Sequence, residues 1–516
     1  MLTSKKLSSC QVSEGEMSAE LVIHMSPYSI VQNPKYQEFI QRFPDTTYHI
    51  YLHEKTSSCH SPSLIEVQTQ LNLLNPSMFQ TMVMPKQQVE NQSKHILAKS
   101  YMKYTYRPTK GISYEGCVED EYGQQFRKSL EEKEDFMKIV NRFKIHLTAK
   151  KSEETASKYP EIVFLGTGSC SPVGVRNVSG ILVHMDEDTS VILDCGEGTF
   201  SQLYKVYGDK TDKVLMNLKG IYISHLHADH HLGAAGILFK RKEAIEKFGK
   251  ELTPILLCVP IQYKSWLRMN EQQFRMKKLK DLLTMVPTQF LMQPPYTVPM
   301  VEGSDPGIED LVKKKLNCNQ VLTVPVKHNK HATGLILEHK SGWKLVYSGD
   351  TMPCDALIDK GNNCDVLIHE ATLQTDMVAD AFKKRHSTYK QAIDVGLEMK
   401  AKFTILTHFS QRYRKIPPYD HKLYHNKFGF AFDCMKVNPS DYSIMHDMID
   451  PLREIFKNDL EIMEEKDNRK KMKQKLSKNH LSQILRADSK GESGNGSNDS
   501  ENTDNKQEWK VKAAKR

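Results

Sequence analysis

Short apolar runs alternate with amphipathic stretches over residues 159–450, and this alternation predicts the core of the fold. Residues 161–166, 180–184 and 190–194 are rich in β-branched or large apolar side chains and end at a glycine or a polar residue, a pattern typical of strands. Strand and helix patterns then take turns along the chain, and the interval 238–320 is expected to be rich in helix. Such alternation predicts α/β layers around a mostly buried sheet.

The segments before and after residues 158–457 differ from them in the pattern of apolar and charged residues. Residues 1–157 mix apolar segments with charged stretches and contain no cluster of ligand-type side chains, so we expect an incomplete or supporting module that ends in a linker. Residues 158–457 carry the alternating pattern. Residues 458–516 are expected to form a charged helix and a disordered basic tail, because residues 489–505 are dominated by Ser, Gly, Asn and Asp. The Lys-rich tract at 469–475 fits a nuclear-import signal, an RNA-binding tail or a solubilising tail.

The densest group of ligand-type side chains in the chain is His225, His227, Asp229 and His230. These residues follow a strand-like run and precede a helical stretch, which predicts a tight loop at a strand end. If the loop stays extended, His225 and His227 point toward one site, and Asp229 and His230 turn toward a second. Imidazole and carboxylate groups suit Zn²⁺, and an open position would leave room for an activated water. The alternative is a surface patch of histidines.

A dinuclear hydrolase needs more ligands than one loop supplies, and three further apolar runs each end in one: His328, Asp350 and His408. Loops at strand ends are where a rigid sheet can aim such groups. His331 is a rival to His328, which follows its strand directly. The simplest partition gives one metal His225, His227 and His328, gives the other Asp229, His230 and His408, and lets Asp350 bridge the two.

Three further residues fit a chemical role beside the metals. Glu370 ends an apolar run, and His386 precedes a helical stretch that begins with Ser and Thr. A histidine at the mouth of the site can protonate a leaving oxygen if an adjacent carboxylate keeps it cationic. The alternative is that His386 only caps the helix. Asp194 follows a strand and is interpreted as a carboxylate that orients the ligand loops.

Composition and charge exclude some classes of protein. No apolar run approaches the ~20 residues that cross a bilayer, and the amino-terminal segment lacks the apolar core of a secretory signal and the arginines of a mitochondrial presequence. The ten cysteines include no CxxC pair, so we expect free thiols. The net charge of +9 arises largely at the end of the chain, where residues 464–516 hold 14 Lys and Arg against 9 Asp and Glu. Bulk charge therefore does not predict a nucleic-acid partner.

The motif set HLHADH, DCGEG, SGDT, HEAT, HST and THFSQRY resembles the metallo-β-lactamase superfamily and, more narrowly, the long form of tRNase Z, which removes the 3′ trailer of precursor tRNA. HxHxDH alone would indicate only the superfamily, whereas HEAT, HST and HFSQRY at these separations are more specific. The resemblance covers about residues 159–440, and residues 21–79 resemble the end of the family's degenerate amino-terminal half. It implies a four-layer αββα sandwich, two zinc ions and a precursor tRNA substrate.

On this resemblance the seven ligands match the partition above, and Asp229 would also position or deprotonate the attacking water. His386, supported by Glu370, would donate the proton to the leaving group. The loop at 172–177 is similar to a family loop that contacts the tRNA 3′ end, which makes Arg176 and Asn177 candidate substrate contacts. The family usually has Lys in the middle of that loop, where this chain has Gly174, and most of the family's amino-terminal half has no counterpart here.

The reaction expected is hydrolytic, leaving a 3′-hydroxyl on the tRNA and a 5′-phosphate on the trailer. Two alternatives stay open: a hydrolase of a small ester or thioester with the same fold, and a non-catalytic RNA-binding scaffold, since the amino-terminal half is short. We expect a nuclear location, with the mitochondrion as an additional location for a full-length form. We expect no membrane partner, and self-association of lactamase-like halves is a further arrangement that the resemblance suggests.

Overall fold

The computed structural model describes residues 19–53, 61–83, 95–118, 121–150, 157–273, 279–293, 307–413, 415–418, 426–469 and 472. The chain divides into two compact units, residues 1–457 and 458–516. In the second unit residues 458–469 are helical, as the sequence predicts, and the rest of the predicted tail lies outside the described residues, apart from position 472. Within the described ranges no helix has both the length and the apolar character to cross a membrane.

The first sheet of the larger unit is mixed and contains the strand that leads to the HLHADH segment. Its strands are β6 (Glu161–Gly166), β7 (Gly180–His184), β8 (Ser190–Cys195), β9 (Leu218–Tyr222), β10 (Ile255–Val259), β11 (Leu283–Pro287) and β18 (Met435–Val437). They lie in the order β11-β10-β9-β8-β7-β6-β18. Strands β8 to β11 pair in parallel and the others antiparallel. The interval expected to be rich in helix therefore also supplies two strands, β10 and β11.

The second sheet carries the remaining ligand loops. Its strands are β12 (Cys318–Pro325), β13 (Thr333–His339), β14 (Lys344–Tyr347), β15 (Val366–Glu370), β16 (Phe403–Thr407) and β17 (Phe428–Phe430), and they are hydrogen-bonded in that order. Strands β14 to β17 are parallel neighbours. Because the carboxyl ends of parallel strands meet at one edge of a sheet, the residues that follow β14, β15 and β16 are brought to the same edge.

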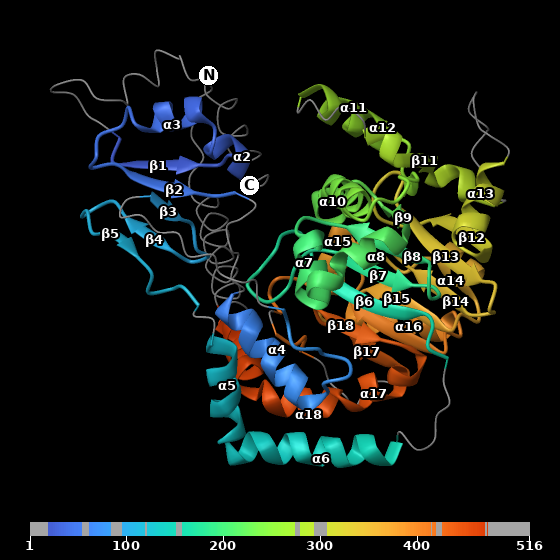
Figure 1. Cartoon of the computed structure of the whole chain (residues 1–516). Helices are drawn as coiled ribbons and strands as arrows, with labels where there is room; N and C mark the ends of the chain where they lie inside the picture. The colour runs from blue at the N-terminus through green and yellow to red at the C-terminus, as the bar shows by residue number, and fades with distance from the viewer. Residues whose placement is uncertain are drawn as a thin grey trace, which may run out of the picture. The chain divides into compact units, whose positions relative to one another are not determined.

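Most helices that follow position 198 lie outside the two sheets (Figure 1), whereas the short α9 (Ala228–His231) carries Asp229 and His230. The others in the larger unit are α7 (Thr199–Tyr207), α8 (Thr211–Asn217), α10 (Ala234–Lys247), α11 (Tyr263–Gln273), α12 (Leu279–Leu282), α13 (Ile308–Lys315), α14 (Asp355–Gly361), α15 (Val378–Lys384), α16 (Tyr389–Glu398), α17 (Tyr442–Asp447) and α18 (Ile449–Ile455). On β6, Val163 packs with Leu203 of α7 and Ile237 of α10, whereas Ile162 and Phe164 point to the opposite face and are equally buried. Helices α14 and α16 cover the second sheet in the same way. The predicted α/β sandwich of two sheets between helical layers is confirmed.

Residues before position 158 form a smaller sheet, a hairpin and three longer helices. The elements are β1 (Leu21–His24), α2 (Tyr28–Val31), α3 (Pro34–Ile40), β2 (Tyr48–Tyr51), α4 (Pro62–Leu74), β3 (His95–Leu97), β4 (Lys103–Thr105), β5 (Gly111–Ser113), α5 (Tyr122–Glu131) and α6 (Glu134–Lys150). Strands β1, β2 and β3 pair in parallel, and β4 and β5 form the hairpin.

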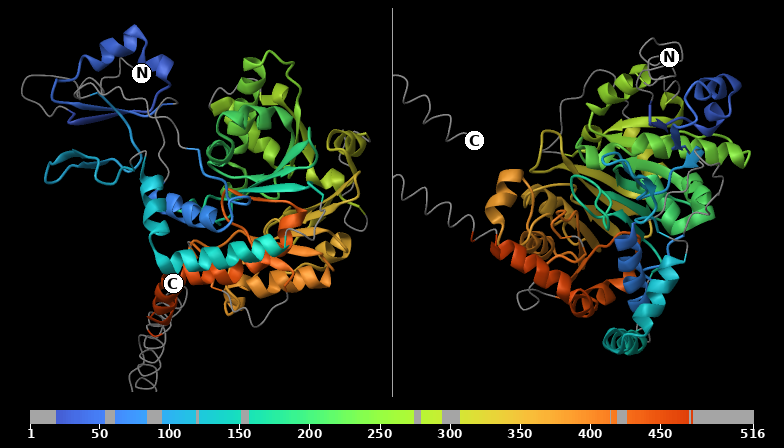
Figure 2. Two further views of the ribbon diagram at one scale, coloured as in Figure 1. Left: turned by 60° about the horizontal axis from the view of Figure 1, so that its bottom comes forward. Right: turned by 90° about the vertical axis from the view of Figure 1, so that its left-hand side faces the viewer.

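The segment around α4 is part of the core of the larger unit. The Gln68 side chain donates a hydrogen bond of 2.6 Å to the carbonyl of Asp433, and Phe79 is fully buried and bridges to Met435 on β18. Helix α6 runs beside α18 (Figure 2). Arg142 of α6 and Glu454 of α18 form an ion pair there. Residues on both sides of position 158 therefore belong to one compact unit.

Three histidines gather on the small sheet, and we call them the small-sheet histidines: His24, His49 and His95. Their rings stack, with centroids 5.1 Å apart for His24 and His49 and 5.0 Å apart for His49 and His95. Nε2 of His24 lies 2.8 Å from Nδ1 of His49. Two more nitrogens meet tyrosine hydroxyls: Nδ1 of His24 lies 3.0 Å from that of Tyr36, and Nδ1 of His95 lies 2.7 Å from that of Tyr51. Burial, followed by the neighbouring histidines, lowers the pKa of both His24 and His49 to about 4.

Candidate metal centre

The seven side chains predicted as metal ligands come from loops at the ends of four strands. His225 and His227 follow β9, and Asp229 and His230 lie on the short helix α9 directly after them. The remaining three follow strands of the second sheet, His328 after β12, Asp350 after β14 and His408 after β16. The structure brings all seven together, and five of them, His225, His230, His328, Asp350 and His408, are at most 6% exposed.

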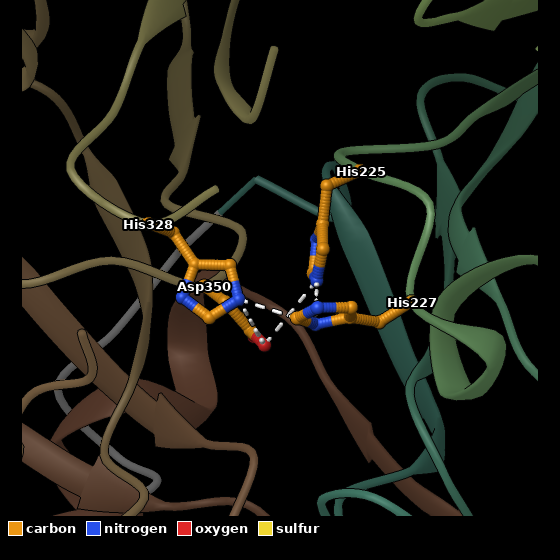
Figure 3. Close-up of side chains that lie close together, drawn as sticks. All are labelled: His225, His227, His328 and Asp350. Carbon is orange, nitrogen blue, oxygen red and sulfur yellow. Dashed lines mark hydrogen bonds and ion pairs between the residues drawn. The ribbon is translucent and has the colours of Figure 1, made fainter. Parts of the chain in front are cut away.

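One set of ligand atoms comes from His225, His227, His328 and Asp350, and these atoms all lie within 4.8 Å of one another (Figure 3). Nε2 of His225 lies 2.8 Å from Nδ1 of His227, which in turn lies 3.2 Å from Nε2 of His328. The Asp350 carboxylate completes the set, 3.6 Å from His225 and 3.8 Å from His328. Ring nitrogens and a carboxylate oxygen that converge on one point are the arrangement a cation requires.

A second set consists of Asp229, His230 and His408. Asp350 also reaches this set, with one carboxylate oxygen 3.3 Å from Nε2 of His230 and the other 3.3 Å from Nε2 of His408. A single carboxylate therefore touches both sets, as the bridging role predicted from the sequence requires.

The electrostatics of the two sets suit a metal ion better than an unfilled hydrogen-bond network. Nε2 of His230 and Oδ1 of Asp350 are buried without a hydrogen-bond partner among the described residues, a costly state unless a cation binds there. Burial, followed by the neighbouring His230, lowers the pKa of His225 well below its usual value, which leaves its imidazole neutral. Although burial alone would raise it, the pKa of Asp350 is lowered well below its usual value by His230 and His408. Although burial lowers it, the pKa of His230 is raised well above its usual value by Asp350 and Asp194, so a metal ion bound there would displace a proton. Neutral imidazoles and ionised carboxylates are the donor set of zinc.

Asp194 holds the ligand loops in place. It accepts hydrogen bonds from the Ser224 backbone at 2.7 Å and from the Tyr347 hydroxyl at 2.6 Å, and it lies 2.7 Å from Nδ1 of His230. Because Nδ1 of His230 is engaged, Nε2 is the nitrogen aimed at the centre. Asp194 reaches these partners from a left-handed backbone conformation, with φ of 52°. These contacts are compatible with the orienting role that the sequence predicts for Asp194.

Other ligands are oriented by partners that the sequence does not reveal. Nδ1 of His408 lies 2.8 Å from the Ser179 hydroxyl, and Nδ1 of His328 lies 2.8 Å from the carbonyl oxygen of Arg385. Ser179 is 229 positions from His408, and a carbonyl group carries no residue-specific signal. Ser224, 3.0 Å from Nδ1 of His225, is the one partner that its position directly before a ligand could have indicated.

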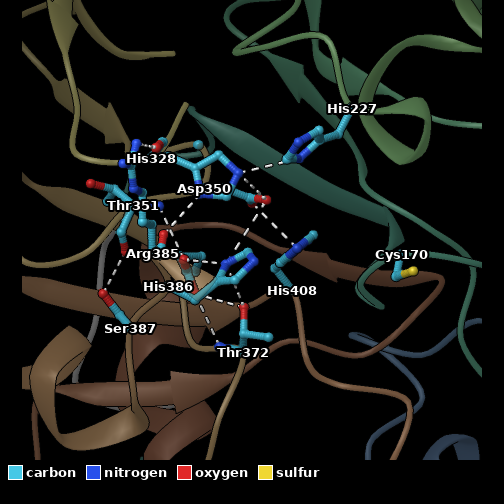
Figure 4. Close-up of polar contacts among 12 residues, drawn as sticks. Cys170, His227, His328, Asp350, Thr351, Thr372, Arg385, His386, Ser387 and His408 are labelled. Atoms are coloured by element: carbon cyan, nitrogen blue, oxygen red, sulfur yellow. Dashed lines mark hydrogen bonds and ion pairs between the residues drawn. The ribbon is translucent and has the colours of Figure 1, made fainter. Parts of the chain in front are cut away.

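His386 lies beside the metal ligands (Figure 4) and contacts the Glu370 carboxylate. Nδ1 of His386 is 2.7 Å from the Glu370 carboxylate and 4.0 Å from that of Asp350. Burial alone would lower the pKa of His386, but the Glu370 carboxylate outweighs it and raises the pKa to about 9. Thr351 and Thr372 donate backbone hydrogen bonds of 3.0 and 3.1 Å to Glu370 and fix its orientation. Helix α16 is capped by Thr388 in a capping box, so the alternative in which His386 caps that helix is wrong.

The remaining histidines weighed at the sequence level lie apart from the two sets. His331 belongs to none of the metal-binding groups found among the described residues, whereas His328 does. His231 packs against Tyr263 and Trp266, with ring centroids 5.5 and 5.1 Å away. His184 and His339 hydrogen-bond to Ser190 and Ser341 respectively.

Arg176, expected to contact substrate, points into the protein. It is 3% exposed, and its guanidinium group stacks between Phe409 and Phe432, 4.8 and 5.2 Å from the ring centroids. It donates to the carbonyl of Ala431 at 3.0 Å. The structure therefore corrects the expectation: Arg176 braces Phe409, the residue next to His408, and does not present its charge to a ligand. Asn177 is partly exposed and donates from its side chain to the carbonyl of Glu197 at 2.9 Å.

Comparison with known proteins places this geometry in context. The profile of the family described as "Anti-Pycsar protein Apyc1" matches residues 160–428. The chain is 39% identical over 450 residues to "Zinc phosphodiesterase ELAC protein 2" of Homo sapiens, an alignment that covers 86% of this chain and 53% of the human protein. It is 32% identical over 490 residues to "Ribonuclease Z, mitochondrial" of Drosophila melanogaster, covering 88% of this chain and 61% of that protein.

Among solved structures, "Crystal structure of a long form RNase Z from yeast" is similar with a TM-score of 0.61 and 24% identity, covering 84% of this chain and 68% of the yeast chain. This similarity confirms the metallo-β-lactamase fold. The chain spans about half the length of the mammalian relatives it matches.

Proposed function

Because the chain belongs to the family described as anti-Pycsar protein Apyc1 and is a homologue of the long form of tRNase Z, we propose that it is a zinc-dependent endoribonuclease that removes the 3′ trailer from precursor tRNA. One observation carries the proposal: seven ligand side chains, six of them buried, converge beside a Glu370–His386 pair. The products would be a tRNA with a 3′-hydroxyl and a trailer with a 5′-phosphate.

In this proposal two zinc ions bind, one to each set of ligands. His225, His227 and His328 hold the first, Asp229, His230 and His408 hold the second, and Asp350 is shared because it touches both sets. When bound, zinc supplies Lewis acidity that lowers the pKa of water and neutralises charge on the phosphate.

Asp229 is the residue that receives or directs the proton of the attacking water. Its carboxylate is held by the Cys170 backbone N–H, which donates a hydrogen bond of 2.6 Å from the loop after β6. Although burial raises it, the pKa of Asp229 is lowered overall by His230 and His408, so the carboxylate is ionised and can accept a hydrogen bond from water.

His386 is the residue that protonates the leaving 3′ oxygen. Its imidazole is cationic near neutral pH because Glu370 holds Nδ1 at 2.7 Å, and this contact leaves Nε2 as the donor. The Glu370 carboxylate is itself ionised, since His386 and, to a smaller extent, His408 lower its pKa below the usual value against the effects of burial and of Asp350. A positioned donor of this kind contributes typically 10²–10⁴-fold to a hydrolytic rate.

A cleavage assay with end mapping tests the proposal. Zinc-loaded protein is incubated with a radiolabelled precursor tRNA that carries a 3′ trailer, and the product ends are identified. We expect one cut at the trailer junction, with a 3′-hydroxyl and a 5′-phosphate. Hydrolysis of a generic thioester without cleavage of the RNA would contradict the proposal, and so would full zinc occupancy without hydrolysis of any phosphodiester.

Two further parts of the proposal concern the cellular setting. We propose a nuclear location, supported by the Lys-rich tract at 469–475, most of which lies outside the described residues. We also propose that the chain associates with a second lactamase-like half, because it spans about half the length of the mammalian relatives. Imaging of a fluorescent fusion tests the first statement, and light scattering of the purified chain tests the second.

A further inference from the structure

Helix α15 is tied at its carboxyl end to the metal centre. The backbone N–H of His386 donates to the carbonyl of Ala381 at 2.9 Å, so His386 continues directly from the last turn of the helix. Arg385 ends the helix in the left-handed conformation, with φ of 57°, and its guanidinium group donates to the carbonyl of His328 at 2.7 Å. Because the Arg385 carbonyl also meets Nδ1 of His328, any ligand on this turn lies beside the catalytic groups.

The outer face of α15 is apolar. Val378 is 50% exposed and Phe382 is 72% exposed, whereas Ala381 on the inner face is 1% exposed. Val378 and Phe382 are four residues apart, so they are neighbours on one side of the helix. A single exposed apolar residue is ordinary on a protein surface, so this face needs a second observation before it indicates a ligand.

The second observation is a concentration of positive charge on the same turn. Lys383, Lys384 and Arg385 follow Phe382 without interruption, and all are exposed. No ion pair joins Lys383 or Lys384 to a carboxylate within the described part of the chain. The acidic residue of the helix, Asp380, lies in its first turn, so the positive charge is gathered at the end that leads to His386.

An aromatic ring beside unpaired cations fits single-stranded nucleic acid. The bases of a duplex are already stacked, so only an unpaired base can stack on an exposed ring, while Lys side chains bind the adjacent phosphates. The location on the turn before His386 selects the nucleotide whose 3′ oxygen leaves. The surface therefore fits the RNA chain on the tRNA side of the cut.

We propose that Phe382, Lys383 and Lys384 form a pad that binds the unpaired RNA next to the scissile phosphate, with a base stacked on Phe382. This inference rests on the proposed endoribonuclease function and names the residues through which the site would hold its substrate. Arg385 links the pad to His328, so that the bound nucleotide and the ligand loop keep a fixed relation.

The test compares an RNA substrate with a small one. Phe382→Ala and the double change Lys383→Gln with Lys384→Gln are made in the full chain and loaded with zinc. Each is assayed on precursor tRNA and on bis(4-nitrophenyl) phosphate, which has no flanking nucleotides. We expect the ratio of kcat/KM for RNA to kcat/KM for the diester to fall about tenfold for Phe382→Ala, the loss of one base stack. Phe382→Trp should retain the ratio.

The matched control is Phe248→Ala. Phe248 is also exposed, at 54%, but it follows the far end of α10, roughly 20 Å along the helix from the ligand loop. The ratio should not change there. An unchanged ratio for Phe382→Ala, or an equal loss on both substrates, would overturn the pad.

A binding measurement separates failure of the pad from failure of the proposed function. Affinity for a short unstructured RNA is followed by fluorescence anisotropy at several salt concentrations. The double change should weaken binding and reduce the salt slope by between one and two units, because two phosphate contacts are lost. If the wild-type protein hydrolyses the diester and binds this RNA but leaves precursor tRNA intact, the tRNA assignment is wrong and the pad stands. If the variants bind the RNA as the wild type does, the pad is wrong.

Discussion

Two groups of histidines in this chain use the same side chain for opposite purposes. At the metal centre, imidazoles from three loops point their nitrogens at a common place that they share with Asp350 from a fourth loop, while Asp194 and other groups contact the second nitrogens. The small-sheet histidines stack their rings face to face, and their nitrogens bond to one another and to tyrosines. None of the metal-binding groups found among the described residues includes them.

The difference shows what makes a histidine cluster a metal site. Proximity is common to both groups, since nitrogen–nitrogen distances of 2.8 Å occur in each. Only the metal centre adds carboxylates whose charge offsets that of a cation, and only there do buried nitrogen and oxygen atoms lack other partners. Zinc binding is therefore predicted by ring nitrogens that converge on one point, by carboxylates beside them and by buried polar atoms without hydrogen-bond partners. The number of histidines alone does not predict it.

Removing the carboxylate of Asp350 should have the largest effect on the difference between the two histidine groups. Asp350→Ala deletes the group that touches both ligand sets, so we expect zinc loading and phosphodiester hydrolysis to be lost together, the latter to background. Metal analysis of the purified variant and the rate on bis(4-nitrophenyl) phosphate give the two readouts. His49→Phe in the small sheet is the matched control and should retain zinc. Wild-type zinc content in Asp350→Ala would show that Asp350 is not a ligand.

Removing the proton donor should separate binding from chemistry within the metal centre. His386→Ala leaves the seven ligands in place, so zinc content should stay at the wild-type level while single-turnover cleavage slows roughly 10²–10⁴-fold. Glu370→Gln should slow the reaction in the same direction, since it removes the charge that keeps His386 cationic. A His386→Ala protein with an unchanged single-turnover rate would remove the assignment.

Removing the charge of Asp194, the carboxylate that faces His230, should have a smaller effect, and the affected property is the affinity for zinc. Asp194→Asn keeps the shape of the side chain but removes the charge facing Nδ1 of His230, so zinc affinity should fall 10- to 100-fold, the usual range for such partners. A competition titration against a chromophoric chelator measures it. Equal affinity in the variant and the wild type would mean that His230 needs no orienting group.

Lowering the pH should reduce the stability of the small sheet. We expect this effect to be the smallest of those predicted. The pKa of His24 and of His49 is about 4 in the folded chain and lies near 6.5 in an unfolded one, so protons bind the unfolded segment preferentially. Stability of the small sheet should therefore be constant above pH 6.5 and decline as the pH falls from 6.5 to 4.

Hydrogen exchange tests this pH dependence. After correction for intrinsic rates, exchange in β1 and β2 should accelerate over that window in the zinc-loaded protein. A His24→Phe change should weaken the dependence. Identical exchange at pH 7 and pH 4.5 would contradict the role given to these histidines.

Several parts of the site could be predicted from the sequence because they depend on short-range pattern. An apolar run that ends in a ligand-type residue identifies a strand end, and this rule alone selected His328, Asp350 and His408. The structure brings these three residues to one edge of the second sheet because β14 to β16 are parallel neighbours, and because β12 runs in the same direction as β14, each being antiparallel to β13 between them. The same rule preferred His328 to His331, which follows its strand less directly.

Other parts depend on contacts that a sequence does not display. Ser179 orients His408 across 229 positions, and Gln68 reaches Asp433 across 365, so neither pairing leaves a local signal. For Arg176 the sequence predicted a contact that the structure does not support. A basic residue in a loop similar to a substrate-binding one suggested an RNA contact, but the aromatic rings of Phe409 and Phe432, far along the chain, lie against its guanidinium group.

Anomalous diffraction at the zinc absorption edge, from crystals of the purified chain, tests the central claim most directly. We predict two peaks, one between His225, His227 and His328 and the other between Asp229, His230 and His408, with Asp350 in contact with both. No peak should lie near His24, His49 or His95. A single peak, or zinc bound at the small-sheet histidines in place of this centre, would contradict the account.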